Sequence, residues 1–174
     1  MKTVYLLRHA KSSWSEPRLS DHDRPLAARG LAAAPRMGEH LSRLRPGPGL
    51  VLCSSSVRTR QTWELVAAQL DEPPPTSFRR ECYHASADDL LRLLQSTDDS
   101  IDAVLLIGHN PGLADLAESL AGRGPALELG RLRLKFPTAA LACFRFDTPT
   151  WRALTPGAGE LSCFVRPRDL TASE

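Results

Sequence analysis

The sequence lacks the long apolar runs and the charge clusters that mark several common classes of protein. None of its apolar stretches approaches the roughly 18 residues that a transmembrane helix needs. Arg8 follows Met1 after too few apolar residues for a secretory signal, so we expect a cytoplasmic protein that binds no membrane. The net charge is only +2, and no block of about five like charges occurs. Composition therefore gives no support to nucleic-acid binding either.

Cysteine is scarce as well, and its spacing is uninformative. Cys53, Cys82, Cys143 and Cys163 stand singly, without any C-x-x-C pair. Zinc sites and disulfide frameworks show regular cysteine spacings, and this chain has none. We predict that all four residues are buried or half-buried thiols.

What the sequence does contain is the composition of an ordinary globular protein. Its 174 residues are 42% apolar and 24% charged, which is enough for one domain with a substantial core. We predict a single domain over residues 1–165, followed by a polar C-terminal tail over residues 166–174.

Hydrophobic periodicity predicts alternating strands and helices. Three short apolar runs read as buried strands, and each is followed by a segment with helical spacing. The strands are expected at 4–7, 50–53 and 101–107, the helices at 31–44, 63–70, 87–95 and 113–120, and a final hairpin at 137–146 and 151–156. Such an order predicts an α/β fold, with helices flanking a mixed and mostly parallel central sheet.

Polar side chains follow each of the three predicted strands. Arg8 and His9 end the first strand, Arg58 follows the second, and His109 follows the third. An isolated Arg-His pair would mark no more than the end of a strand. However, the carboxyl ends of parallel strands open onto one ligand crevice, so these four side chains are expected to converge.

Two arginines and two histidines in one pocket favour an anionic ligand, and a phosphoryl group is the obvious candidate. Arg8 and Arg58 can bind its oxygens in a bidentate manner. Positive neighbours disfavour the imidazolium form of His9, which leaves a ring nitrogen free for nucleophilic attack. A metal site built from His9 and His109 would need carboxylate partners that these motifs do not supply, so we predict no metal and no cofactor. The serines at 54–56 read as helix caps, because no G-x-S-x-G elbow surrounds them.

These residues also carry a family resemblance. The segments Leu7-Arg8-His9-Ala10, Ser55 to Thr62 and Gly108-His109-Asn110 resemble the three signatures of the histidine phosphatase superfamily, which includes the phosphoglycerate mutases. Five segments are similar to the small SixA-type phosphohistidine phosphatases: Arg8 to Ser12, Asp23-Arg24-Pro25-Leu26 closing on Arg29-Gly30, Tyr83-His84-Ala85-Ser86, Gly108 to Gly112 and Phe136-Pro137-Thr138-Ala139. The resemblance implies a three-layer α/β/α sandwich like that of phosphoglycerate mutase.

The resemblance also implies residue roles. His9 would be the nucleophile that becomes phosphorylated, and Arg8, Arg58 and His109 would form the phosphate pocket. Glu81 occupies the stretch in which the family's proton donor lies, although it could equally form a surface ion pair with a neighbouring arginine. We expect His84 to pack or to cap a turn. Lys11, Ser12 and Trp14 either line the mouth of the site or belong to a solvated loop.

The function implied is that of a metal-independent phosphatase working through a phosphohistidine intermediate. Its expected partners are a phosphorylated protein, carrying phosphohistidine in a phosphorelay, and the phosphate ion released. Two alternatives stay open: a phosphatase acting on small phosphate esters, and a non-catalytic module that binds phosphorylated ligands.

Overall fold

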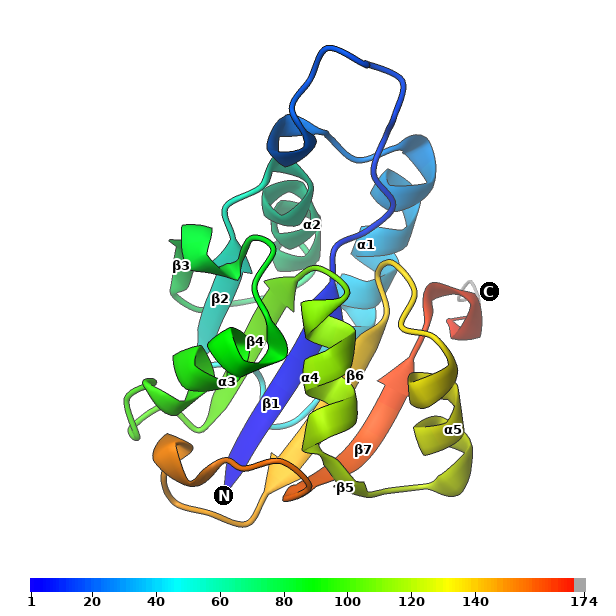
Figure 1. The fold of residues 1–174 in the computed structure, drawn as a ribbon. Helices are drawn as coiled ribbons and strands as arrows, with labels where there is room; N and C mark the ends of the chain where they lie inside the picture. The colour runs from blue at the N-terminus through cyan, green and yellow to red at the C-terminus, as the bar shows by residue number, and fades with distance from the viewer. Residues whose placement is uncertain (171–174) are drawn as a thin grey trace.

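Seven strands form one mixed sheet in the computed structural model, which describes residues 1–170 (Figure 1). The strands are β1 (Lys2–Arg8), β2 (Leu50–Ser54), β3 (Thr76–Arg79), β4 (Ala103–Gly108), β5 (Ala121–Arg123), β6 (Leu141–Phe146) and β7 (Gly159–Val165). Their order across the sheet is β3-β2-β4-β1-β6-β7-β5. The first four of these neighbours run parallel, and β6 is antiparallel to both β1 and β7. Strand β5 pairs with β7 in parallel, so β6 is the one strand of reversed direction, and β1 lies beside it in the middle of the sheet.

Helices cover both faces of the sheet. They are α1 (Ala28–Ser42), α2 (Val57–Ala67), α3 (Ala87–Gln95), α4 (Gly112–Leu120) and α5 (Ala126–Leu134). Single 3-10 turns occur at η1 (Asp21–Asp23), η2 (Arg80–Cys82), η3 (Trp151–Ala153) and η4 (Pro167–Asp169). Figure 1 shows α4 in front of the sheet and α1 behind it.

Alternation along β1 separates two apolar cores. Val4 and Leu6 point to the face covered by α3, α4 and α5, whereas Tyr5 and Leu7 point to the face covered by α1 and α2. All four side chains are at most 2% exposed, as expected for a strand that is buried on both sides. The predicted three-layer α/β/α sandwich with a mixed central sheet is confirmed.

The prediction of a second hairpin strand at 151–156 is wrong. Residues Trp151–Ala153 form the turn η3, and the strand that pairs with β6 is β7. The indole nitrogen of Trp151 donates to the carbonyl oxygen of Ile101 at 2.8 Å, and its backbone N–H donates to Asp99 at 2.8 Å. These bonds fix Trp151 at the amino end of β4, away from any sheet ladder.

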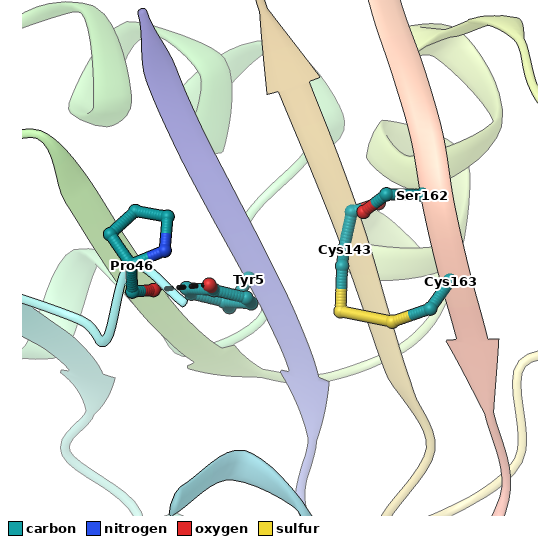
Figure 2. The surroundings of a disulfide bond; sticks show 5 residues. All are labelled: Tyr5, Pro46, Cys143, Ser162 and Cys163. Atoms are coloured by element: carbon teal, nitrogen blue, oxygen red, sulfur yellow. Dashed lines mark hydrogen bonds between the residues drawn. A yellow bond between two sulfur atoms is a disulfide. The ribbon is translucent and has the colours of Figure 1, made fainter. Parts of the chain in front are cut away.

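The prediction of four cysteine thiols is also wrong for one pair. Cys143 on β6 and Cys163 on β7 are joined by a disulfide (Figure 2). The antiparallel register places the two residues opposite each other, with their Cα atoms 5.1 Å apart. Cys53 and Cys82 are buried free thiols, as predicted.

The segment predicted as a C-terminal tail begins with ordered structure. Arg166 bonds Asp169 across η4, and Leu170 packs against the core on the side of α1. Residues 171–174 of that tail lie outside the described residues. In residues 1–170, no helix combines the length and the apolar character required to cross a membrane.

Candidate active site

The register between β1 and β4 brings the two histidines together. Arg8 pairs with Gly108 in this parallel ladder, so His9 and His109 each occupy the next position beyond it. Their ring centroids lie 5.2 Å apart. Both residues are nearly buried, at 7% and 5% exposed, and each ring borders the same pocket of about 220 Å³.

Helix α2 supplies Arg58 to this pocket from its first turn. The helix begins with Ser56 as N-cap, whose side chain accepts a hydrogen bond from the backbone of Thr59. Arg58 is only 4% exposed. Its Nη2 donates to Asp21 Oδ2 at 3.0 Å and to His109 Nδ1 at 3.3 Å, so the guanidinium is held on two sides.

Arg8 is held by the loop between α5 and β6. Its Nη1 donates to the carbonyl oxygen of Phe136 at 3.0 Å, and Asn110 Nδ2 donates to the same oxygen at 2.9 Å. The backbone N–H of Ala139 reaches the carbonyl oxygens of Arg8 and His9, both at 3.1 Å. The structure thus brings Arg8, His9, Arg58 and His109 together, and all four line the pocket.

A third arginine lines the pocket, and sequence reasoning gave it no role. Arg24 is 7% exposed and lies against the ring of Trp14, 3.2 Å from its centroid. Its Nε donates to the carbonyl oxygen of Ser13 at 3.0 Å, and its Nη2 donates to Ser12 Oγ. The available signal was the long loop before α1, because long ordered loops are commonly functional.

Asp21, in the turn η1, forms hydrogen bonds with two of the three arginines, Arg24 and Arg58. It accepts hydrogen bonds from Arg24 Nη1 at 2.9 Å, from Arg58 Nη2 at 3.0 Å and from the hydroxyl of Tyr83. The Tyr83 bond, together with those from the two arginines, holds the pKa of Asp21 well below its usual range. The side chain therefore stays a carboxylate, and it orients two cations without donating a proton.

His9 is neutral and carries a free lone pair. Its Nδ1 lies 2.7 Å from the carbonyl oxygen of Ala10, and since a carbonyl can only accept, Nδ1 must carry the proton. Burial, with added repulsion from Arg58, Arg8 and Arg24, lowers the pKa of His9 to about 3. Near neutral pH the unprotonated Nε2 is the nucleophilic atom of this ring.

His109 is also neutral. Burial, followed by its neighbours His9 and Arg58, lowers its pKa to about 2. Its Nδ1 accepts from Arg58, because a guanidinium has only donors, so Nε2 carries the proton and donates to Ser54 Oγ at 2.7 Å. The pocket therefore combines three arginines with two uncharged imidazoles, which is an arrangement for binding a compact oxyanion.

Comparison with known proteins agrees with this geometry. Residues 4–82 match the model of the histidine phosphatase superfamily (branch 1). The SixA protein of Agrobacterium tumefaciens, whose assigned activity is that of a phosphohistidine phosphatase, is 30% identical; the match covers 95% of this chain and 98% of that one, with a TM-score of 0.80. The chain belongs to the histidine phosphatase superfamily.

Two further matches extend over nearly the whole chain. The SixA protein of Nakamurella multipartitia has a TM-score of 0.83 at 26% identity, covering 95% of this chain and 96% of that one. An uncharacterized protein of Mycobacterium tuberculosis is 33% identical over 165 residues, which are 93% of this chain and 100% of the relative. This histidine phosphatase is therefore SixA-like in fold and in extent.

The structure does not bring Glu81 to the pocket of this histidine phosphatase. Its carboxylate pairs with Arg79 at 3.2 Å, its side chain is 58% exposed, and it is absent from the pocket lining. The cause is local: Glu81 lies in η2, and its neighbour Cys82 is the residue buried there. Glu81 therefore forms the surface ion pair with a neighbouring arginine that the sequence left as the alternative.

The residues for which the sequence left two interpretations lie at the mouth of the pocket. Lys11, Ser12 and Trp14 all line it. His84, expected to pack or to cap a turn, also lines it and stacks on Tyr83 with ring centroids 4.0 Å apart. In the part of the chain that the structure describes, no three His, Cys, Asp or Glu side chains gather as a metal site would require.

Proposed function

We propose that this protein removes the phosphoryl group from phosphohistidine on a partner protein, through a covalent phosphohistidine at His9. One observation carries the proposal: a neutral histidine with a free Nε2 lies among three arginines, in a pocket that no Asp or Glu lines. Such a pocket offers a nucleophile and charge stabilisation, yet no carboxylic acid.

In the first step, His9 Nε2 attacks phosphorus while Arg8, Arg24 and Arg58 bind the phosphoryl oxygens. The bond from phosphorus to the substrate nitrogen breaks as the bond from phosphorus to Nε2 forms. The Nδ1–H bond to Ala10 holds the ring in the reactive tautomer throughout. Phosphoryl transfer depends mainly on positioning and on stabilising the charge of the transferring group, which the arginines provide.

The leaving group explains why phosphohistidine suits this pocket. An alkyl ester expels an alkoxide, which needs a proton from an acid of the enzyme. A phosphohistidine ring can carry a proton on its second nitrogen, so it departs as neutral imidazole. A pocket without a carboxylic acid is thus adequate for the phosphoramidate bond and poor for unactivated esters.

In the second step, water attacks the phosphorylated His9. The bond from phosphorus to Nε2 breaks, inorganic phosphate leaves with the protons of water, and neutral His9 is restored. His109 and Arg58 remain beside the transferred group during this step, within the same pocket. No step draws on a metal ion.

A protein-borne substrate fits the open mouth of the pocket. Trp14 is 72% exposed, and the side chain of His84 is 63% exposed. A histidine side chain that projects from a protein surface can reach such a site without a lid having to open. The SixA proteins of Nakamurella multipartitia and Agrobacterium tumefaciens, which match this chain, are both assigned as phosphohistidine phosphatases.

The test is a rapid-quench assay with a chemically phosphorylated histidine protein and with p-nitrophenyl phosphate. Wild type should form an acid-labile, base-stable phosphoenzyme and turn over the phosphohistidine protein faster than the ester. His9→Ala should form no phosphoenzyme. Turnover of the wild type should persist after dialysis against EDTA.

Other outcomes would select the alternatives. Preference for the ester would keep the intermediate and make the protein a small-molecule phosphatase. Phosphate binding without turnover or phosphoenzyme would leave a binding module. Loss of turnover in EDTA, restored by a divalent cation, would contradict a metal-independent mechanism.

A further inference from the structure

A second and larger groove adjoins the phosphate pocket. It has a volume of about 630 Å³ and is lined by residues of α1, of α5 and of the C-terminal turn η4. Lys11 and Thr138 border both the groove and the pocket. A ligand that fills the groove would therefore reach the site of His9 without leaving the surface.

The groove is lined by basic side chains from every element around it. Besides Lys11 they are Arg29, Arg36, Arg131, Lys135, Arg166 and Arg168, and no Asp or Glu lines it. Within residues 1–170, Arg166 alone among these cations forms an ion pair, with Asp169. For a chain whose net charge is only +2, this is a strong local excess of positive charge, although Asp169 pairs with Arg166 and also attracts Arg131.

The surface between these charges is apolar. Ala32, Ala33, Pro137 and Pro167 contribute to it, and so does Leu134, which is 86% exposed. A nucleic-acid backbone or an inorganic polyanion has no apolar group that would pack against an exposed leucine. An acidic polypeptide segment, with carboxylates and apolar side chains interspersed, complements both the charges and the apolar surface.

We propose that this groove docks an acidic segment of the phosphorylated partner protein while its phosphohistidine enters the neighbouring pocket. The identity of the phosphorylated group rests on the proposed function. The groove selects the partner by charge, and the pocket performs the transfer. Long-range attraction of this kind raises the association rate and weakens with salt.

The test compares two synthetic peptides that each carry one phosphohistidine and one leucine. One peptide is flanked by glutamates, and the other by glutamines. The variant Arg36→Gln/Arg131→Gln removes one charge from each helix that borders the groove, and neither residue lines the phosphate pocket. The control Arg43→Gln/Arg152→Gln removes two exposed charges outside the groove.

Wild type should hydrolyse the glutamate peptide with at least a tenfold higher kcat/KM than the glutamine peptide at low ionic strength. The groove variant should lose most of that advantage, mainly through KM, and should hydrolyse p-nitrophenyl phosphate like wild type. The control variant should behave like wild type on all three substrates. Equal kcat/KM for the two peptides on wild type would overturn the docking proposal.

A binding measurement separates failure of docking from failure of the proposed function. Fluorescence anisotropy with the unphosphorylated peptides should show tighter binding of the glutamate peptide, reduced in the groove variant. If wild type hydrolyses p-nitrophenyl phosphate but neither phosphopeptide, the proposed substrate is wrong, and this binding difference still decides the groove. Tighter binding of a short DNA duplex than of the glutamate peptide would overturn the polypeptide as occupant.

Discussion

His109 Nε2 donates a hydrogen bond to Ser54 Oγ, with the two atoms 2.7 Å apart, at the point where β2 ends beside β4. Because Arg58 donates to Nδ1 of the same ring, both nitrogens of His109 are engaged. In this state His109 positions Arg58. Arg58 Nε is buried without a hydrogen-bond partner, so Arg58 can donate to an arriving phosphoryl group while it keeps its bond to His109. The role of His109 as a direct phosphate ligand stays a prediction.

Arg58→Ala should cost about 2–4 kcal/mol of transition-state stabilisation, by analogy with other preorganised donors. The guanidinium is buried against the reacting pocket, so no solvent molecule can replace its fixed charge. The measurement is kcat/KM with p-nitrophenyl phosphate. Arg60→Ala removes an exposed arginine from the same helix and should change little. Near-normal turnover of Arg58→Ala would remove Arg58 from the site.

Asp21→Asn should lower kcat/KM by roughly tenfold or more, because Arg24 and Arg58 lose the carboxylate that orients them both. The effect should also appear as weaker inhibition by inorganic phosphate. Asp23→Asn is the matched control in the same turn, since Asp23 contacts Ser20 and His22 instead. Identical kinetics for the two variants would show that Asp21 does not position the arginines.

Folding stability should fall as the pH is lowered from about 6.5 toward 3. Burial holds the pKa of His9 near 3 and that of His109 near 2 in the folded state, whereas the unfolded chain has ordinary histidine values. In that window the unfolded state binds more protons, so the free energy of unfolding decreases with acidification, by about 1–2 kcal/mol per histidine at pH 5.

Urea unfolding at pH 7.5 and at pH 5 measures this dependence. His109→Gln should show a smaller difference between the two pH values than wild type, whatever its stability at either one. His84→Gln replaces a largely exposed histidine and serves as control. An unchanged pH dependence in His109→Gln would mean that the folded protein binds a proton at this ring.

Glu81→Gln should retain nearly wild-type turnover of both p-nitrophenyl phosphate and an unactivated alkyl phosphate. The exposed pair with Arg79 contributes little to stability, and the carboxylate does not line the pocket. A loss confined to the alkyl phosphate, which has the poorer leaving group, would instead establish Glu81 as the proton donor predicted from the sequence.

The central part of the fold could be predicted because its signals are local. Val4 to Leu7 form an apolar run that ends in Arg8 and His9, and the polar residues at such a strand end point toward a crevice. The same reasoning located His109 after β4 and Arg58 after β2. This reasoning assigned no role to Arg24, because its loop has no periodicity. Only the fold shows which of the loop's polar residues turns inward.

The C-terminal third was harder to predict from the sequence than the central part. Helix α5 has no single apolar face: Leu132 is buried, whereas Leu127 and Leu134 are 61% and 86% exposed. Strand β7 contains a register shift opposite Cys143 and Phe144, which breaks the alternation that identifies a strand. Without β7, nothing in the sequence could place Cys163 beside Cys143.

The position of β1 in the sheet also makes the surroundings of His9 depend on contacts that are distant in the sequence. Thr3 pairs with Ala103 on one side and with Arg145 on the other, so β1 can complete its two ladders only with segments far along the chain. Contacts this distant in sequence make folding slow relative to local helix formation. His9, which directly follows β1, therefore gains its functional environment only when both β4 and β6 have paired with this strand.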